Sequence, residues 1–273
     1  MSLIIFTDLD GTLLNQDDYK YDRAVPAIEE LKAQKIPVIP VTSKTREEVE
    51  ALLVELDLKA PFVVENGSGV FVANNDRRFS LPDKQQDSDY YLELLGCTYN
   101  RAREGLKAIA EALGEELRGF GDLSEAEIEK LTGLPPEAVK RAKAREFTEP
   151  FLTPRQVDPE KLKQAVEERG FRVVVGDRFS HLIWGEAGKG KGSMWLKQQY
   201  LPTLSGEKVI TVGLGNSPND LDMLEVVDYP IIIPGKNGPH PGLVGKGWEV
   251  ARSPGCQGWA ESVREICERL ISS

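Results

Sequence analysis

The sequence predicts an α/β protein with a Rossmann-like parallel-sheet core domain and a smaller α/β domain inserted into it. Short apolar segments alternate with helical ones in 3–72, the same alternation returns in 188–271, and a differently patterned region separates the two. Strands that alternate with helices form βαβ units, and such units build parallel sheets. We therefore predict a core at 1–83 and 185–273, with the inserted domain at 84–184.

Each element of the first half follows from its own pattern. The run LIIFTD at 3–8 is β-branched and aromatic without a helical period, which is typical of a buried strand. Segments 24–35 and 45–58 carry apolar residues at helical spacing, so both predict helices. Segment 36–41 predicts a short strand, and 61–72 predicts two strands joined by an Asn-Gly turn.

The middle of the chain changes character before the first pattern returns. Residues 81–91 are polar and bounded by proline, which is typical of a linker. Amphipathic helical segments follow at 101–117 and within 123–147, and then short strands at 171–177 and 180–185. Beyond the insert, the expected alternation of helices and strands occupies 188–201, 208–215, 217–227, 228–234 and 258–271.

Composition and charge exclude several classes of function. The chain has 273 residues, of which 40% are hydrophobic and 29% charged, and this is ordinary for a globular protein. A net charge of -10 argues against general nucleic-acid binding, which requires a basic face. The apolar runs are too short to cross a bilayer, and the N-terminus lacks the basic start of a secretory signal. Three widely spaced cysteines suit a reduced, cytoplasmic protein.

Two carboxylates stand at the end of the first predicted strand. Asp8 and Asp10 are one residue apart, so both can point into a cleft at the carboxyl edge of a parallel sheet, where ligands bind. Neighbouring carboxylates repel each other unless a cation lies between them, and Mg²⁺ takes carboxylate and phosphate oxygens. The pattern indicates phosphoryl transfer, in which Asp8 attacks phosphorus and Asp10 transfers protons. A solvated turn is the alternative, since Asp and Gly favour turns.

The segment DLDGTLL, which begins at Asp8, resembles the first motif of the haloacid-dehalogenase superfamily of phosphatases. Three further motifs follow in that family's order: Thr42 after the second strand, Lys189 (with Lys191 as an alternate) at the start of a helix, and the acidic segment GLGNSPNDLDML. The resemblance implies the catalytic residues Asp8, Asp10, Thr42 and Lys189. It also implies a Mg²⁺ ion held by Asp8, Asp10, Asn216 and Asp220.

One position departs from that family's pattern. The family usually has Asp where this chain has Asn216. Asparagine keeps an oxygen ligand but lacks the charge, so we expect weaker magnesium binding. A sugar-phosphate sensor that has lost catalysis is an alternative consistent with the same departure.

The insert lies between the second and third motifs, where this superfamily places a C2-type cap, a lid that contacts the non-reacting part of the substrate. Within it, TGL at 132–134 and AREFTEPF at 144–151 resemble the mannosyl-3-phosphoglycerate phosphatases. This resemblance implies hydrolysis of 2-O-mannosyl-3-phosphoglycerate to mannosylglycerate, a compatible solute, through an aspartyl-phosphate. Glucosyl-3-phosphoglycerate, sucrose phosphate and a phosphomutase reaction remain open, and the oligomeric state is not predicted.

A substrate that carries a phosphate, a carboxylate and a sugar needs cationic and polar partners, and arginine suits the carboxylate. Arg145 and Glu146 could instead be solvated charges at a helix end, and His181 could pack in a core. The predicted substrate-binding residues are Thr42, Ser43, Lys44, Glu65, Asn66, Gly67, Arg145, Glu146, Arg178, His181, Lys189 and Asn219.

Overall fold

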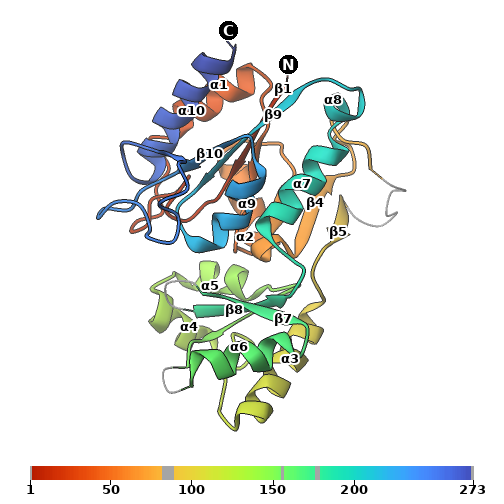
Figure 1. Cartoon of the computed structure of the whole chain (residues 1–273), viewed down its shortest axis with the longest axis vertical. Coiled ribbons are helices and arrows are strands. Elements are labelled where there is room, and N and C mark those ends of the chain that lie inside the picture. The colour runs from red at the N-terminus through yellow and green to blue at the C-terminus, as the bar shows by residue number, and fades with distance from the viewer. Residues whose placement is uncertain (1, 82–88, 155–156, 176–178, 272–273) are drawn as a thin grey trace.

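The computed structural model of the chain has two parts, a core and a cap, and Figure 1 shows the cap below the core. The N-terminal strand and the C-terminal helix both belong to the core, so the chain leaves the core to build the cap and then returns. The structure describes residues 2–81, 89–154, 157–175 and 179–271.

A five-stranded sheet in which every pair is parallel forms the centre of the core. β1 is flanked by two strands, so Ile5 pairs with Val38 on one side and with Val212 on the other. The parallel sheet confirms the predicted fold class. Across the sheet the strands are β11 (Glu249–Val250), β10 (Tyr229–Ile232), β9 (Val209–Gly215), β1 (Ser2–Thr7) and β2 (Val38–Pro40).

A second sheet of three antiparallel strands continues from the edge of the first, because Val41 forms a parallel bridge with Val63. Its strands are β3 (Phe62–Val64), β4 (Gly69–Ala73) and β5 (Tyr90–Leu94). The linker predicted at 81–91 lies largely outside the described residues, and its last two residues, Tyr90 and Tyr91, begin β5. Because β5 pairs with β4, it belongs with this sheet and not with the cap sheet. The division at residue 84 stays a prediction, and the strand pairing argues that the cap begins after Leu94.

Helices cover both faces of the core sheet. Side chains that alternate along β1 enter two separate hydrophobic clusters: Leu3 and Ile5 one, Ile4 and Phe6 the other. No described helix combines the length and apolar character needed to cross a membrane. The core helices are α1 (Val25–Ala33), α2 (Arg46–Glu55), α7 (Lys189–Gln199), α8 (Leu201–Leu204), α9 (Leu221–Val226) and α10 (Gly255–Ile271), with short 3-10 turns η1 (Glu65–Gly67) and η2 (Pro218–Asp220).

The cap has its own sheet and two hydrophobic clusters of its own. Its antiparallel strands lie in the order β6 (Glu149–Leu152), β8 (Phe179–Trp184) and β7 (Phe171–Val175). Neither β6 nor α6 was predicted from the sequence, although Asp158 and Pro159 are a recognisable helix start. The cap helices are α3 (Tyr99–Leu113), α4 (Glu125–Thr132), α5 (Pro136–Lys143) and α6 (Pro159–Glu167).

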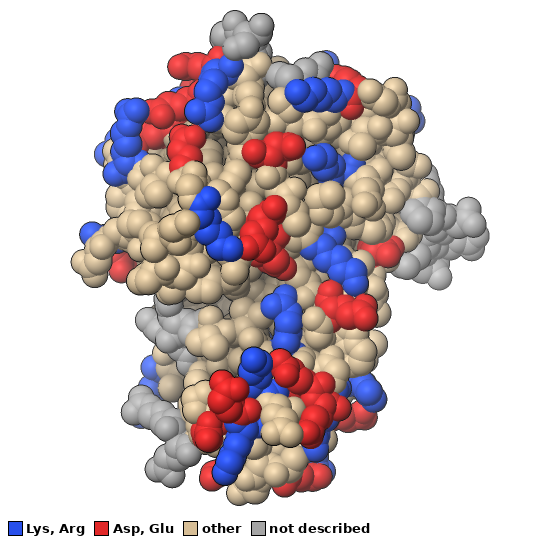
Figure 2. Space-filling view, viewed as in Figure 1, with Lys and Arg blue, Asp and Glu red and all other residues tan. Residues whose placement is uncertain are grey.

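Charged side chains of both signs are mixed on the visible face of the molecule. Figure 2 shows Lys and Arg interspersed with Asp and Glu over the core and the cap, without a broad basic area among the described residues of that face. A surface of this kind lacks the basic stripe that nucleic-acid binding requires. The absence of a nucleic-acid partner stays a prediction.

Candidate active site

The predicted motifs meet at the carboxyl edge of the core sheet. Asp8 follows β1, Thr42 follows β2, and Asn216 follows β9 directly. Carboxyl ends of neighbouring parallel strands lie at one edge of a sheet, which is where ligands of open α/β folds bind. In Figure 1 the cap lies beside this edge.

Lys189 joins two carboxylates at this edge. Its Nζ lies 2.6 Å from Asp8 Oδ1 and 2.6 Å from Asp220 Oδ1, and its side chain is fully buried. Burial lowers the pKa of Lys189, but Asp220 and Asp8 together raise it by more than burial lowers it. The lysine therefore stays charged. This contact brings together the residues of the first, third and fourth predicted motifs.

The electrostatic environment disfavours the ionised form of Asp8. Burial and the nearby charge of Asp220 raise the pKa of Asp8 to about 7, against the opposing effect of Lys189. Thr12 Oγ1 lies 3.4 Å from Asp8 Oδ2 and is its only neutral side-chain donor among the described residues. A further positive ion beside Asp8 would favour the carboxylate form that nucleophilic attack requires.

The oxygens near Asp8 suit a magnesium ion. Asp10 Oδ1 and Asn216 Oδ1 are buried and have no hydrogen-bond partner in the described structure. Gly11 brings their loops together, since a Cβ at Gly11 would lie 2.2 Å from Asn216 Nδ2. With Asp8 these groups would offer a divalent metal oxygen donors only, the kind that Mg²⁺ prefers. The described residues contain no group of three or more His, Cys, Asp or Glu arranged for a metal, so the ligand set of Asp8, Asp10, Asn216 and Asp220 stays a prediction.

Asp220 has contacts that define a positioning role. Its Oδ1 accepts from Lys189, and its Oδ2 accepts the backbone N–H groups of Asn216 at 2.9 Å and Ser217 at 3.0 Å. Asp220 thereby holds both the lysine and the loop that carries Asn216. Metal ligation by Asp220 stays a prediction, because both of its oxygens are engaged by the protein.

The second motif supplies a partner for Asp10. Lys44 Nζ lies 3.0 Å from Asp10 Oδ2 and 3.4 Å from Glu48 Oε1. Burial lowers the pKa of Lys44, but Asp10 and Glu48 raise it above its usual value. Thr42 is fully buried, and its Oγ1 accepts the N–H of Lys44 at 3.2 Å. The structure thus places Lys44 beside the predicted proton-transfer residue.

The structure does not support the predicted contact between Glu65 and the sugar. Glu65 is fully buried, and four donors from cap residues 146–148 bind its carboxylate. Burial raises its pKa, and Arg145 with these donors opposes that effect. Asn66 Oδ1 accepts from Asn219 Nδ2 at 3.3 Å, so Asn66 and Asn219 do meet at the site.

The predicted cap residues differ in what they contact. Arg145 Nη1 donates to the carbonyl oxygen of Ser43 at 2.8 Å, whereas Glu146 accepts from Arg46 Nε at 2.8 Å. Burial, Arg145 and Lys189 lower the pKa of His181 to about 3, so this histidine is neutral near pH 7. Arg178 lies outside the described residues.

Sequence reasoning missed two threonines at the boundary between core and cap. Thr45 caps α2 together with Glu48, and its Oγ1 donates to the carbonyl oxygen of Arg141 in the cap at 2.8 Å. Thr148 donates its hydroxyl to Glu65 at 2.6 Å. The capping pattern Thr-x-x-Glu signals the local role of Thr45, but no sequence signal indicates either contact across the boundary.

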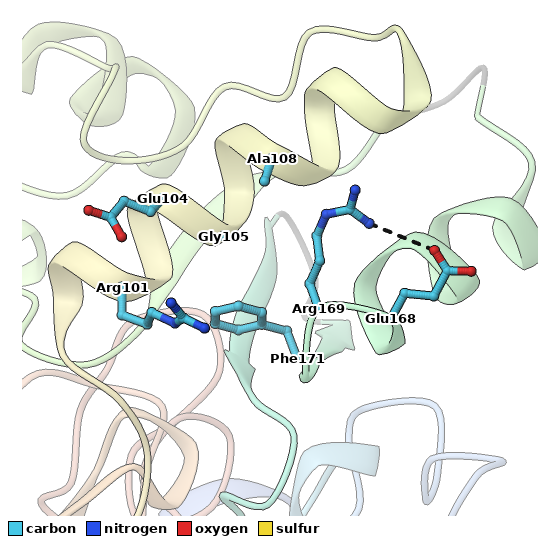
Figure 3. Close-up of a pocket in the computed structure, with 7 residues that line it drawn as sticks. All are labelled: Arg101, Glu104, Gly105, Ala108, Glu168, Arg169 and Phe171. Atoms are coloured by element: carbon cyan, nitrogen blue, oxygen red, sulfur yellow. Dashed lines mark ion pairs between the residues drawn. The ribbon is translucent and has the colours of Figure 1, made fainter.

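A cavity of about 370 Å³ lies on the cap and is separate from these residues. Figure 3 shows it between α3 and the turn that leads from α6 into β7, with Arg169 directed toward Glu168. None of the predicted site residues lines it. The lining residues are Arg101, Glu104, Gly105, Ala108, Glu168, Arg169 and Phe171.

Known proteins resemble this chain over most of its length. Residues 5–101 match the family model of haloacid dehalogenase-like hydrolases. A glucosyl-3-phosphoglycerate/mannosyl-3-phosphoglycerate phosphatase from Persephonella marina is 40% identical over 268 residues, covering 98% of both chains. A mannosyl-3-phosphoglycerate phosphatase from Pyrococcus furiosus is 35% identical over 234 residues, covering 85% of this chain and 91% of the other.

Solved structures share the fold at low sequence identity. A haloacid dehalogenase-like hydrolase from Bacteroides thetaiotaomicron is 16% identical, with a TM-score of 0.65 over 97% of this chain and 100% of the other. The sucrose-phosphatase from Synechocystis sp. PCC6803 is 15% identical, with a TM-score of 0.59 over 97% and 98% of the two chains. Since the named relatives match almost the whole chain, the chain belongs to the haloacid dehalogenase-like hydrolases and is a phosphoric monoester hydrolase.

Proposed function

We propose that this phosphatase hydrolyses 2-O-mannosyl-3-phosphoglycerate to mannosylglycerate and phosphate, with Mg²⁺ and an aspartyl-phosphate at Asp8. The observation that carries the proposal is the buried bridge from Asp8 through Lys189 to Asp220, together with oxygens of Asp10 and Asn216 that no described residue binds. The names of the relatives supply the substrate class. Glucosyl-3-phosphoglycerate is the second candidate substrate, because the Persephonella marina protein carries both sugars in its name.

The residues of the chain divide the reaction between them. A carboxylate oxygen of Asp8 attacks the phosphorus, and the ester oxygen leaves with a proton from Asp10. Asp10 then takes a proton from water as that water attacks the phosphorus, which releases phosphate and restores Asp8. Lys189 balances charge on Asp8 throughout.

Mg²⁺, held by Asp8, Asp10 and Asn216, would supply positive charge to the phosphoryl oxygens. Lys44 holds Oδ2 of Asp10, and Oδ1 has no hydrogen-bond partner among the described residues. Asp10 is therefore fixed at one oxygen, which leaves the other for the magnesium ion or for proton transfer.

The two alternative functions, a phosphomutase and a non-catalytic sensor, have less support. A phosphomutase would return the phosphoryl group to the product, and no contact in the described structure favours that step. A non-catalytic sensor is suggested by Asn216 alone, whereas the buried ion pairs around Asp8 suit a nucleophile.

We also propose a cytoplasmic location, because Cys97, Cys256 and Cys267 are all free. Titration of the purified protein should find three thiols.

Phosphate release from a panel of sugar phosphates with Mg²⁺ tests the proposed function. Mannosyl- and glucosyl-3-phosphoglycerate should be hydrolysed faster than sucrose phosphate. Asp8→Asn should lower kcat at least about a thousandfold with unchanged circular dichroism. Asp18→Asn, on an exposed loop, is the matched control. Full activity in Asp8→Asn, or no release from either phosphoglycerate, would refute the proposal.

A further inference from the structure

The core residue Glu65 accepts hydrogen bonds from the backbone of cap residues 146–148. Its Oε1 accepts the N–H of Glu146 at 2.8 Å. Its Oε2 accepts the N–H of Thr148 at 2.8 Å and the Thr148 hydroxyl at 2.6 Å, with the N–H of Phe147 at 3.3 Å. Arg145 and these donors act against the rise in the pKa of Glu65 that burial causes, and hydrogen bonds to the ionised carboxylate are about twice as strong as neutral ones.

The turn that carries Glu65 has an unusual backbone. Glu65, Asn66 and Gly67 have φ values of 49°, 57° and 86°, so three successive residues are left-handed. Residues with a side chain rarely adopt this conformation, and where they do the surroundings enforce it, often at functional sites. Gly67 is required here, since a Cβ would lie 2.0 Å from the carbonyl oxygen of Gly188, the residue before Lys189.

The residue preceding the bound cap segment is Arg145. Its side chain is 5% exposed, and its Nη1 lies 3.8 Å from Glu65 Oε2 and donates to the Ser43 carbonyl. Its Nε is buried and has no hydrogen-bond partner in the described structure. A buried donor without a partner calls for an explanation, and a ligand oxygen would supply one. Ser43, whose carbonyl oxygen accepts from Arg145, directly follows Thr42 of the second motif, so the arginine lies near the catalytic edge.

A second ion pair crosses the same boundary but is of another kind. Arg46 and Glu146 are 36% and 33% exposed, so water screens their attraction. Glu65 is fully buried, and three of its four donors are backbone N–H groups that cannot rotate away. The position of residues 145–148 therefore depends on Glu65 far more than on Arg46.

We propose that Glu65 is a positioning residue that fixes cap residues 145–148 on the core and thereby holds Arg145 beside the leaving-group side of the substrate. Arg145 Nε then donates to a carboxylate or hydroxyl oxygen of that group. The inference rests on the proposed function, because it requires a leaving group that carries such oxygens. A phosphate ester without them gains nothing from the arrangement.

Two substrates separate positioning from a general defect. In Glu65→Gln, kcat/KM for the preferred hexosyl-3-phosphoglycerate should fall about thirtyfold, the effect of one charge-assisted hydrogen bond. Hydrolysis of p-nitrophenyl phosphate, whose leaving group has no carboxylate or hydroxyl, should change less than about threefold. Arg46→Gln should change both rates less than about threefold. An equal loss on both substrates in Glu65→Gln would overturn the proposal.

Hydrogen exchange of the ligand-free protein tests the same contact without a substrate. Glu65→Gln should raise the exchange rate of the amides of residues 146–148 and of α5, which packs on α2 of the core, and Arg46→Gln should not. Thr148→Val, which removes one of the four donors to Glu65, should raise the exchange rate by an intermediate amount. If Glu65→Gln does not fold, this variant tests whether Glu65 holds the cap. Unchanged exchange in these variants would overturn the proposal. If no hexosyl-3-phosphoglycerate is hydrolysed by the wild type, the proposed function fails, and exchange still tests whether Glu65 holds the cap.

Discussion

The core side and the cap side of the candidate site hold their charges in different ways. On the core side, Lys189 is paired with the carboxylates of Asp8 and Asp220, and all three side chains are almost fully buried. On the cap side, the carboxylate of Glu65 is bound by backbone N–H groups of the cap and by Thr148. Opposite side-chain charges maintain a fixed electrostatic centre, whereas backbone donors fix the position of a neighbouring segment. The paired charges of Asp8 and Lys189 therefore suit a role in the reaction, whereas the backbone contacts of Glu65 suit the positioning of the cap.

The largest effect should come from removing the charge at the core centre. Lys189→Met leaves two buried carboxylates without their cation, so we expect loss of activity and a free energy of unfolding lower by about 3–5 kcal/mol. Urea denaturation and phosphate release measure the two effects. Lys191→Met, two residues along the same helix and 47% exposed, should change the free energy of unfolding by less than about 0.5 kcal/mol. Similar losses of activity and of unfolding free energy in the two variants would show that the buried Lys189 is no more important than the exposed Lys191.

On the cap side, His181 should make the free energy of unfolding depend on pH. Its pKa is about 3 in the folded protein and near 6.5 in the unfolded chain, so the unfolded state binds more protons between these values. Stability therefore falls as the pH drops below about 6.5, and between pH 7 and 5 this histidine should account for about 2 kcal/mol. Urea titrations at both pH values should show that His181→Gln removes this loss, with the exposed His240→Gln as control. A wild-type pH dependence in His181→Gln would contradict the prediction.

A substitution at Asn216 sharpens the assignment of the metal site. Asn216→Asp adds a negative charge to the oxygen set of Asp8 and Asp10, so half-maximal activity should need about tenfold less Mg²⁺. Thermal unfolding at increasing Mg²⁺ gives a second readout that does not depend on turnover. Asn219→Asp, which changes the same residue type three positions along the loop, serves as the comparison. An unchanged Mg²⁺ requirement in Asn216→Asp would remove Asn216 from the proposed ligands.

The smallest effect should come from an ion pair remote from both sides. Arg264 on α10 binds Glu30 on α1 through its Nη2 at 2.7 Å, and both side chains are well exposed. Such pairs contribute about 0–1 kcal/mol, and salt screens them. Arg264→Gln should lower the free energy of unfolding by less than about 1 kcal/mol at low salt and by less at high salt. A loss comparable to that of Lys189→Met would show that burial does not separate the strong pairs from the weak ones.

Much of the core site could be predicted because it depends on strand ends. Asp8 and Lys189 are 181 positions apart, yet each lies in a motif at the end of a strand or the start of a helix. Parallel strands bring such positions to one edge wherever they occur in the chain. The elements that the sequence analysis missed are short or ambiguous, such as β6, which has four residues and includes Pro150. Their pairing depends on neighbours that no local period reveals.

The sequence by itself determined the order of the core elements, the four motifs at the catalytic edge and the presence of an insert, because local apolar periods and turn residues encode them. Only the tertiary structure decided that Asp220 holds the lysine and the Asn216 loop, that Lys44 pairs with Asp10, and that Glu65 faces the cap backbone. The donors to Glu65 lie 81–83 residues further along the chain and three of them are peptide N–H groups, which every residue except proline has. A contact of this kind leaves no trace in residue type or spacing, so the fold alone specifies it.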